Sequence, residues 1–539
     1  LFDPFGDSSF YSGSGYFILY WVAISMSKTI IIIGAGLAGL SAALQAAENG
    51  CNVKLVSSLP SERAQSVMAE GGINAALNTK DENDSPEEHF TDTIKAACGL
   101  ADQNAVWGMT QAAPELVHWL LKLGVKFNMS GYDDVDLRNF GGQKKKRTAF
   151  AQSDTGKQIM TAMIDAVRRK EASGMVERFS NHSFLTLRLC GNICCGCVIR
   201  DEYSQETVEL PGDAVIVATG GMHGLFGNTT GSLSNTGEVT AELFRLGVPL
   251  ANGEMIQYHP TTVKCGGKRM LISEAARGEG GRLFAMKDGK QWYFMEEKYP
   301  ELGNLMPRDI TAREIWKVSH ESEVFLDMTE ISDEIISNKL SGLADDCMTY
   351  LHKDIRKEPV SVLPGIHYFM GGILVDEQHR TPIQNLCAAG ECCAQYHGAN
   401  RLGGNSLLGA LYGGRVAAKS ACEQADVVDL SCATQIDFPP ASQISEIKQL
   451  NKVMQETMGV VRNENTLLNG IQTVQALTGN LPLLGMAVLK SALARKESRG
   501  AHWREDYPKS NDDDYLKTTV ARFDGKQIQI SFVPVPERR

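Results

Sequence analysis

Runs of apolar residues predict the first elements of the chain. Thr29–Ile33 is an unbroken β-branched run, typical of a parallel strand that is buried on both faces. A glycine-rich turn follows it, then a helix that we expect to end at Glu48, then a second strand at Val53–Ser57. This order predicts a βαβ unit and therefore an α/β domain at the start of the chain.

Apolar positions at helical spacing continue along the sequence. They predict amphipathic helices at Pro86–Ala97, Ala105–Leu123 and Thr155–Lys170, and a shorter helix at Gly237–Leu246. Two strands that frame a cysteine-rich hairpin lie between the last two of these helices. A polar tail ends in a final strand, which we expect at Gln527–Pro534.

Changes in the pattern of apolar and polar residues divide the chain into five expected parts. Residues 26–255 and 356–430 are predicted to be two pieces of one nucleotide-binding domain, and residues 256–355 an inserted domain. Residues 431–539 are expected to form a C-terminal helical domain with its tail. Residues 1–25 contain no Lys or Arg, and we interpret them as an extraneous or disordered segment before a natural start at residue 26. Their apolar run is only about half a membrane span.

Composition and charge narrow the class of protein. The chain has 539 residues, 43% of them hydrophobic and 22% charged, as in ordinary globular proteins. The net charge is −11 and no long basic run occurs, which argues against nucleic acid as a partner. An anionic substrate is still compatible with this charge, because a local cluster of Arg and His can oppose the overall charge.

Cysteines raise a question of metal binding. Four of the 13 cysteines crowd together, at Cys190, Cys194, Cys195 and Cys197. A metal or iron–sulfur site is one interpretation, but paired C-x-x-C spacing is missing and the segment alternates like a strand. We therefore favour a β-hairpin whose small apolar positions are cysteines, and we predict no metal. The odd number of cysteines favours reduced thiols over a disulfide framework.

The turn after the first strand carries a dinucleotide-binding fingerprint. Gly34, Gly36 and Gly39 have the spacing that lets a pyrophosphate approach the beginning of a helix. The second strand lacks the acidic ribose ligand that nicotinamide dehydrogenases carry there. A second glycine-rich strand end, at Thr219 and Gly220, is typical of FAD proteins with two dinucleotide-binding folds, although a plain strand-to-loop turn is the alternative.

Eight segments together resemble one family. They match, in order, the motifs of the fumarate reductase/succinate dehydrogenase flavoproteins, and they lie at residues 63–74, 139–150, 257–261, 273–280, 307–309, 367–372, 397–407 and 497–502. The resemblance implies an α/β fold: a two-dinucleotide-binding-fold FAD domain with an inserted α+β capping domain and a C-terminal helical domain. It also implies the interconversion of fumarate and succinate by hydride transfer at N5 of FAD.

The resemblance assigns roles to eight residues of the substrate site. It implies Arg308 as the proton donor, with Glu274 and Arg277 as a proton relay. The substrate-binding residues that it implies are His259, Ser273, His367, Arg401 and Phe140. Taken singly, Arg308, Glu274 and Arg277 would be interpreted as ion-pair residues, and His259 and His367 as core histidines. Their appearance together in the family's order favours the functional interpretation.

The resemblance also implies a set of FAD contacts. These are Gly34, Gly36, Gly39, Ser57, Ser66, Gly71, Gly72, Thr219, Gly220, Glu238, Glu391, Arg401, Ser406 and Leu407. Gln65 stands where many family members have the histidine that carries the flavin covalently, so we expect non-covalent FAD. Without the covalent link, which raises the flavin potential, fumarate reduction should be favoured. Glu70 resembles the fumarate reductase version of its segment and points the same way.

Three other functions remain as alternatives. L-aspartate oxidase shares the fold and the non-covalent FAD, but Phe140 and the glycines after it look like the dicarboxylate-only enzymes. Another enoate or keto-acid reductase of the superfamily is the second alternative. A flavoprotein that only passes electrons is the third, and for it the Arg and His set would serve no purpose.

The resemblance also bears on partners and location. The family commonly pairs this subunit with an iron–sulfur protein, often on a membrane anchor, and we expect such a partner. The expected location is the cytoplasm, with peripheral attachment to the inner face of the membrane through partner subunits as an option.

Overall fold

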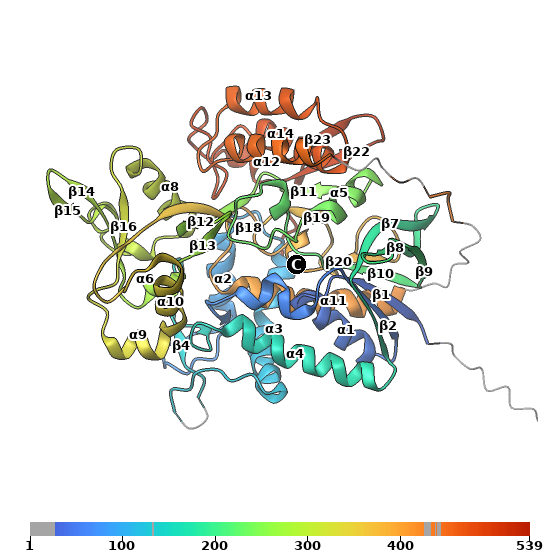
Figure 1. Ribbon diagram of the computed structural model, residues 1–539, viewed down its shortest axis with the longest axis horizontal. Coiled ribbons are helices and arrows are strands. Elements are labelled where there is room, and N and C mark those ends of the chain that lie inside the picture. Colours follow the sequence, from blue (N-terminus) through green and yellow to red (C-terminus); the bar gives the residue numbers. More distant parts are fainter. Residues whose placement is uncertain (1–26, 132–133, 425–432, 437, 439–442, 539) are drawn as a thin grey trace, which may run out of the picture.

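The structure is a computed structural model that describes residues 27–131, 134–424, 433–436, 438 and 443–538. The expected extraneous segment, residues 1–25, lies outside the described residues, as does part of the expected linker near residues 428–442. Figure 1 shows the nucleotide-binding part in the lower right, with the cap to the left and the C-terminal helices above.

A five-stranded parallel sheet forms the centre of the nucleotide-binding part. Its order is β20 (Leu386–Ala388), β10 (Ala214–Val217), β1 (Thr29–Ile33), β2 (Asn52–Ser57) and β6 (Val176–Ser180). All four pairings are parallel. The central strand β1 is covered on both faces, which explains its run of isoleucines.

Helices of the N-terminal half pack on this sheet as one hydrophobic core. They are α1 (Leu37–Glu48), α2 (Pro86–Ala96), α3 (Gln103–Leu123) and α4 (Thr155–Ala172), joined by α11 (Asn405–Gln424) from later in the chain. The helices predicted for this region agree with α1 to α4 to within two residues at each end. Short strands β3 (Ile73–Asn74), β4 (Leu137–Arg138) and β5 (Thr148–Ala149) form a small sheet beside them.

The cysteine-rich segment forms the hairpin that its alternation predicted. Strands β7 (His182–Cys190) and β8 (Ile193–Asp201) pair antiparallel, and β9 (Thr207–Pro211) completes the sheet. Cys194 and Cys197 are buried with Leu187 and Ile199. Cys190 is disulfide-bonded, so the expectation of reduced thiols was wrong at this position. The helix α5 (Glu238–Arg245) packs against β7.

A second group of sheets builds the cap. Strands β13 (Lys268–Leu271), β12 (Ile256–Cys265) and β18 (Leu363–Phe369) form one antiparallel sheet. A four-stranded sheet has the order β15 (Lys290–Trp292), β14 (Arg282–Lys287), β16 (Val324–Asp327) and β17 (Val360–Ser361). The helices are α6 (Glu274–Gly278), α7 (Phe294–Lys298), α8 (Arg308–Val318), α9 (Asp333–Lys339) and α10 (Ser341–Asp346). They share their own hydrophobic core.

The C-terminal part combines helices with a further sheet. The helices are α12 (Ile444–Thr457), α13 (Glu464–Val474), α14 (Asn480–Ala494) and α15 (Asp512–Tyr515). The sheet has the order β21 (Cys393–Ala394), β19 (Gly372–Leu374), β11 (Leu250–Ala251), β22 (Lys517–Phe523) and β23 (Ile528–Pro534). The polar tail was expected to hold one strand, and β22 is a second strand that was not predicted. Among the described residues, no helix has the length and apolarity needed to cross a membrane.

Buried ion pairs join the C-terminal helices to the rest. Arg495 is fully buried and its guanidinium lies 2.7 Å from the carboxylates of both Glu254 and Glu497. It also donates to the backbone carbonyls of Tyr515, at 2.8 Å, and Lys517, at 2.7 Å. Because Glu254 precedes β12 and Lys517 begins β22, this one side chain connects three parts of the chain.

We predict that Arg495→Leu destabilises the protein by about 3–5 kcal/mol, because the buried Glu254 loses its countercharge and Glu497 keeps only Arg499. Urea unfolding followed by tryptophan fluorescence measures the change. Lys496→Leu is the matched control, since Lys496 is exposed on the neighbouring position and its loss should cost less than about 0.5 kcal/mol. Equal midpoints for the two variants would contradict the role given to Arg495.

Candidate active site

A cavity of about 540 Å³ lies at the carboxyl ends of the parallel strands. Gly34 follows β1, Ser57 ends β2, Ala218 follows β10 and Ala389 follows β20, and all four line it. In an α/β sheet, ligands bind in the crevice at this edge. The cavity continues under the cap to residues of β12, α6 and β18, so a long ligand and a small one could lie end to end.

The glycines of the fingerprint differ in what surrounds them. A Cβ on Gly34 would lie 2.2 Å from the carbonyl oxygen of Ala218, and one on Gly39 would lie 1.9 Å from that of Gly34. These two glycines allow close packing of strand and helix. A Cβ on Gly36 would meet no described atom closer than 3.7 Å, and Gly36 lines the cavity. The space beside it and the start of α1 can therefore accept a phosphate.

Almost all the predicted FAD contacts border this cavity. Its lining includes Gly34, Gly36, Ser57, Ser66, Gly71, Gly72, Thr219, Gly220, Glu238, Glu391, Arg401, Ser406 and Leu407. Gly39 does not line it, because its role is to pack against Gly34. Burial raises the pKa of the Glu238 carboxyl.

Polar groups along the cavity suit a dinucleotide such as FAD. The buried Ser57 hydroxyl has no hydrogen-bond partner among the described atoms, as expected of a group that awaits a ligand. Ser66 accepts a hydrogen bond from the backbone N–H of Leu37 at 3.3 Å. The Glu391 carboxylate accepts one from the backbone N–H of Phe369 at 3.0 Å. The residues present therefore fit FAD.

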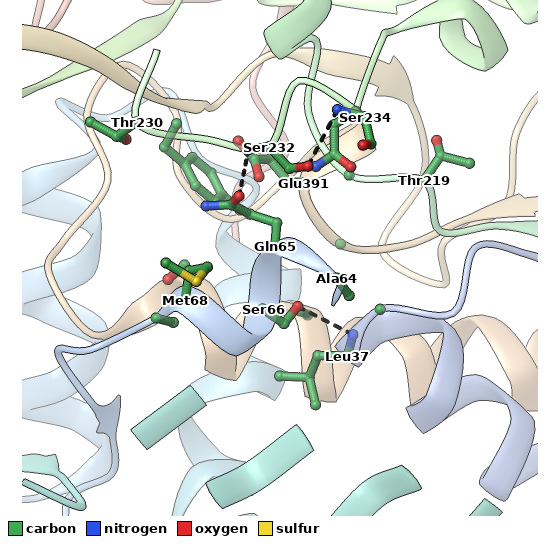
Figure 2. A pocket seen from close by; sticks show the side chains of 18 of the residues that line it. Leu37, Ala64, Gln65, Ser66, Met68, Thr219, Thr230, Ser232, Ser234 and Glu391 are labelled. Carbon is green, nitrogen blue, oxygen red and sulfur yellow. Dashed lines mark hydrogen bonds between the residues drawn. The ribbon is translucent and has the colours of Figure 1, made fainter. Parts of the chain in front are cut away.

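Gln65 lies on the cavity wall, in the segment that Figure 2 shows. Its side-chain oxygen accepts a hydrogen bond from the backbone N–H of Ser232 at 2.5 Å. The carboxamide is held by a loop from another part of the chain. Nearby, burial raises the pKa of Glu70 to about 8, so this carboxyl is mostly protonated at neutral pH.

The far end of the cavity gathers the predicted substrate residues. His259 and His367 lie on the neighbouring strands β12 and β18, with ring centroids 5.1 Å apart. Burial and the nearby Arg308 hold the pKa of both imidazoles well below the usual range, so both are neutral in the free site. Ser273 and Phe140 line the same end.

Arg401 completes this end of the cavity. Its guanidinium carbon lies 4.5 Å from the centroid of the Tyr368 ring, a cation–π contact that fixes its plane. Burial lowers its pKa to about 9, which leaves it charged at neutral pH. Its Nε has no partner in the part of the chain that the structure describes.

Three buried charged groups stand beside the two histidines. Arg308 donates to Oε2 of Glu274 from Nε at 2.8 Å and from Nη2 at 2.5 Å. Nη2 of Arg277 lies 3.3 Å from Oε1 of the same carboxylate. Burial alone would raise the pKa of Glu274, but Arg308 and Arg277 together hold it below the usual range. The three side chains form a continuous ionic chain that begins at the cavity.

Gln257, to which the sequence assigned no role, connects Arg308 with Arg401. The side-chain oxygen of Gln257 accepts from Nη1 of Arg308 at 3.1 Å, and its Nε2 donates to the backbone oxygen of Arg401 at 2.8 Å. It also donates to Asn400 at 3.0 Å. Gln257 belongs to the recognised motif at residues 257–261 and stands two residues before His259. This spacing in a strand was the signal that could have indicated a place for Gln257 beside the site.

The fold and the cavity define an FAD-binding flavoprotein with a capping domain. A family model described as FAD binding domain matches residues 29–407, and one described as Fumarate reductase flavoprotein C-term matches residues 477–538. The chain belongs to the fumarate reductase/succinate dehydrogenase flavoprotein family, a family of FAD-dependent oxidoreductases. The predicted family, fold class and FAD cofactor are thereby confirmed.

Individual relatives agree over most of their length. The succinate dehydrogenase flavoprotein subunit of Bacillus subtilis is 38% identical over 95% of this chain and 98% of that protein. The 8-methylmenaquinol:fumarate reductase flavoprotein subunit of Wolinella succinogenes is 32% identical over 95% of this chain and 92% of that protein.

Solved structures show the same arrangement. A quinol fumarate reductase chain from E. coli superposes with a TM-score of 0.86 at 27% identity, covering 95% of this chain and 97% of that one. Sdh1 of Mycobacterium smegmatis gives 0.80 at 29% identity and covers 95% of each chain.

We predict that Gly36→Ala raises the dissociation constant for FAD about tenfold or more, because the new methyl group occupies the space that a phosphate needs. The fold should be unaffected, since the added atom touches no protein atom closely. Fluorescence titration of the apoprotein with FAD measures the affinity, and thermal unfolding of the apoprotein checks the fold.

Gly459→Ala is the control for this experiment, because a Cβ there would meet no described atom closer than 3.6 Å and Gly459 does not line the cavity. Unchanged FAD affinity in Gly36→Ala would mean that the phosphate does not pass beside Gly36.

Proposed function

We propose that this chain is the FAD-containing catalytic subunit of an enzyme that interconverts fumarate and succinate. The observation that carries the proposal is the cationic end of the cavity, where Arg401, two histidines and the Arg308–Glu274–Arg277 chain converge. The names of the relatives from Bacillus subtilis and Wolinella succinogenes support it.

The clamp for the substrate carboxylates consists of His259, Ser273, His367 and Arg401. A planar guanidinium can bind a carboxylate through two parallel hydrogen bonds, and the histidines add directed donors. Polarisation of one carboxylate stabilises the negative charge that develops on the adjacent carbon during reduction. FAD, when bound, supplies the hydride to fumarate or accepts it from succinate.

Arg308 donates the proton that completes the reduction. Its guanidinium is buried at the cavity, where the substrate excludes water, and the carbanion-like species is basic enough to take a proton from it. Glu274, held as a carboxylate, accepts two hydrogen bonds from Arg308 and contacts Arg277. This chain returns a proton to Arg308 from the outer side. In the reverse direction the same groups remove a proton from succinate.

Gln65 supports non-covalent FAD and a preference for fumarate reduction. A carboxamide has no nucleophilic ring nitrogen, and its oxygen is engaged with Ser232. A non-covalent flavin has a lower potential, which favours giving electrons to fumarate. Glu70 supports the same direction through its resemblance to the fumarate reductases.

The proposal includes partners and a location. Electrons reach the flavin from an iron–sulfur protein subunit, and a membrane anchor can hold the complex. The flavoprotein then lies in the cytoplasm, or peripherally on the inner face of the cytoplasmic membrane through these partners. Within the described part of the chain, no three His, Cys, Asp or Glu side chains are grouped so that they could hold a metal ion.

We predict that Arg308→Met lowers kcat/KM for fumarate by about 10²- to 10⁴-fold, because a positioned proton donor is lost. Bound FAD, measured by its absorbance after gel filtration, should be unchanged. The control is Lys317→Met on the same helix, whose side chain is 46% exposed and outside the cavity. Turnover by Arg308→Met at the control's rate would exclude Arg308 as the donor.

Anaerobic kinetics test the proposed reaction itself. The FAD-loaded chain should oxidise a reduced viologen rapidly with fumarate and reduce a dye only slowly with succinate. Oxidation of L-aspartate with release of hydrogen peroxide would make it an aspartate oxidase instead. Activity with none of the three would direct the search to related enoates. Acid precipitation should release all the FAD from the protein, and retained flavin would contradict its non-covalent binding.

A further inference from the structure

A short strap, residues 229–232, connects the flavin side of the cavity with the substrate side. Its backbone is fixed at both ends. The N–H of Thr230 donates to the carbonyl of Ile366 on β18 at 2.9 Å, and the N–H of Ser232 donates to Gln65 at 2.5 Å. Figure 2 shows Thr230 and Ser232 on this strap beside the cavity, with Gln65 below them.

The hydroxyl of Thr229 contacts a buried histidine that none of the recognised motifs contains. Nδ1 of His223 lies 3.0 Å from Oγ1 of Thr229, and both residues are fully buried. On the other side of the ring, Nε2 of His223 lies 3.5 Å from the Glu391 carboxylate. Glu391 is a cavity residue that we expect to bind FAD.

The hydrogen-bond directions at Thr229 define the tautomer of His223. Oγ1 of Thr229 already accepts from the backbone N–H of Gly231 at 3.1 Å. Among the described residues, the acceptor within reach of its own proton is Nδ1 of His223, so the hydroxyl donates to that nitrogen. The ring proton then resides on Nε2, on the side of Glu391. Oε1 of Glu391 accepts a hydrogen bond from the N–H of Phe369, and Nε2 of His223 lies 3.5 Å from the same oxygen, a contact whose geometry falls short of a hydrogen bond, which leaves Oε2 for a ligand.

Two glycines make room for this arrangement. A Cβ on Gly231 would lie 2.2 Å from the His223 ring, and a Cβ on Gly221 would lie 2.6 Å from Oε1 of Glu391. The imidazole is therefore packed against the backbone of Gly231 and the carboxylate against that of Gly221, which restricts the orientation of both.

The hydroxyl of the next residue, Thr230, lies on the substrate side of the cavity. Oγ1 of Thr230 lies 2.8 Å from Nδ1 of His367. The neutral ring carries one proton, and a carboxylate ligand requires it on Nε2. Thr230 can donate to Nδ1 and so stabilise that tautomer. A hydroxyl also allows protonation of His367, because it can turn and accept instead.

We infer that Thr229 and Thr230 are positioning residues for two different ligands. Thr229 orients Glu391 toward FAD through His223. Thr230 orients His367 toward the dicarboxylate, and this second role rests on the proposed function. Neighbouring side chains in one strap thereby orient two histidines for two different ligands.

Thr229→Val and Thr230→Val test this separation, since each removes one hydroxyl at nearly constant volume. Thr229→Val should raise the dissociation constant of the apoprotein for FAD about tenfold, because it loses the orientation of Glu391. Thr230→Val should leave the dissociation constant for FAD within about twofold of the wild-type value. Fluorescence titration with FAD gives both values, without any turnover.

The reverse pattern is expected for a dicarboxylate. We use malonate, which has no double bond to reduce, and follow the flavin absorbance of FAD-saturated protein. Thr230→Val should weaken malonate binding about tenfold and raise KM for fumarate more than it lowers kcat, whereas Thr229→Val should leave malonate binding within about twofold. Thr229→Ser and Thr230→Ser should restore each value.

Several outcomes would overturn the inference. A general loosening of the fold would weaken the binding of both FAD and malonate in both variants, and it would also lower the temperature of thermal unfolding. If Thr229→Val does not fold, His223→Gln replaces it and should weaken FAD alone. Malonate binding to Thr230→Val at the wild-type level refutes the role of Thr230, provided that the wild-type protein binds malonate. If the wild-type protein does not, the proposed function itself fails.

Discussion

The candidate active site depends on a single carboxylate that is buried between two guanidinium groups. Glu274 begins α6 in the cap, Arg308 begins α8, and Oε1 of Glu274 also accepts from the backbone N–H of Gly141, in the nucleotide-binding part. Glu274, to which we assign the proton relay, therefore connects the cap with the nucleotide-binding part. A buried ionic group is stable only when its partners are in place, so the hydrogen bond from Gly141 to this carboxylate ties the cap to the nucleotide-binding part at the site itself.

The local order of elements was predictable because it depends on local pattern. The isoleucine run of β1, the fingerprint glycines and the helix that ends at Glu48 follow from periodicity and turn chemistry alone. The strand β22 escaped prediction because its alternation is weak and its partners are β11 and β23, one of them more than 250 residues earlier in the chain. The pairing with β11 leaves no mark on a local window, and the hairpin with β23 was missed because three consecutive residues of β22, Thr519 to Ala521, are buried in place of an alternating pattern.

The same distinction applies to the site. Arg308, His259, Arg401 and Gln257 all stood in recognisable motifs, but the link that Gln257 makes between Arg308 and Arg401 appeared only in three dimensions. His223 and Thr230 lie in a stretch without a motif and acquire their meaning from β18 and Glu391, both more than 130 residues away. Positioning residues act through partners that the fold supplies, so a single sequence identifies them poorly.

The charge in the cavity argues for a dicarboxylate. The whole chain carries −11, yet Arg277 and Arg308 contact the carboxylate of Glu274 and Arg401 lines the same end of the cavity, which gives these four groups a charge of +2. The two histidines add none, because burial keeps them neutral. Fumarate and succinate carry −2 and balance it. L-aspartate carries −1, and its ammonium group would lie in a cationic site beside the apolar ring of Phe140. In a buried site, where water screens charges poorly, that mismatch is costly, so the electrostatics favour the dicarboxylates over the amino acid.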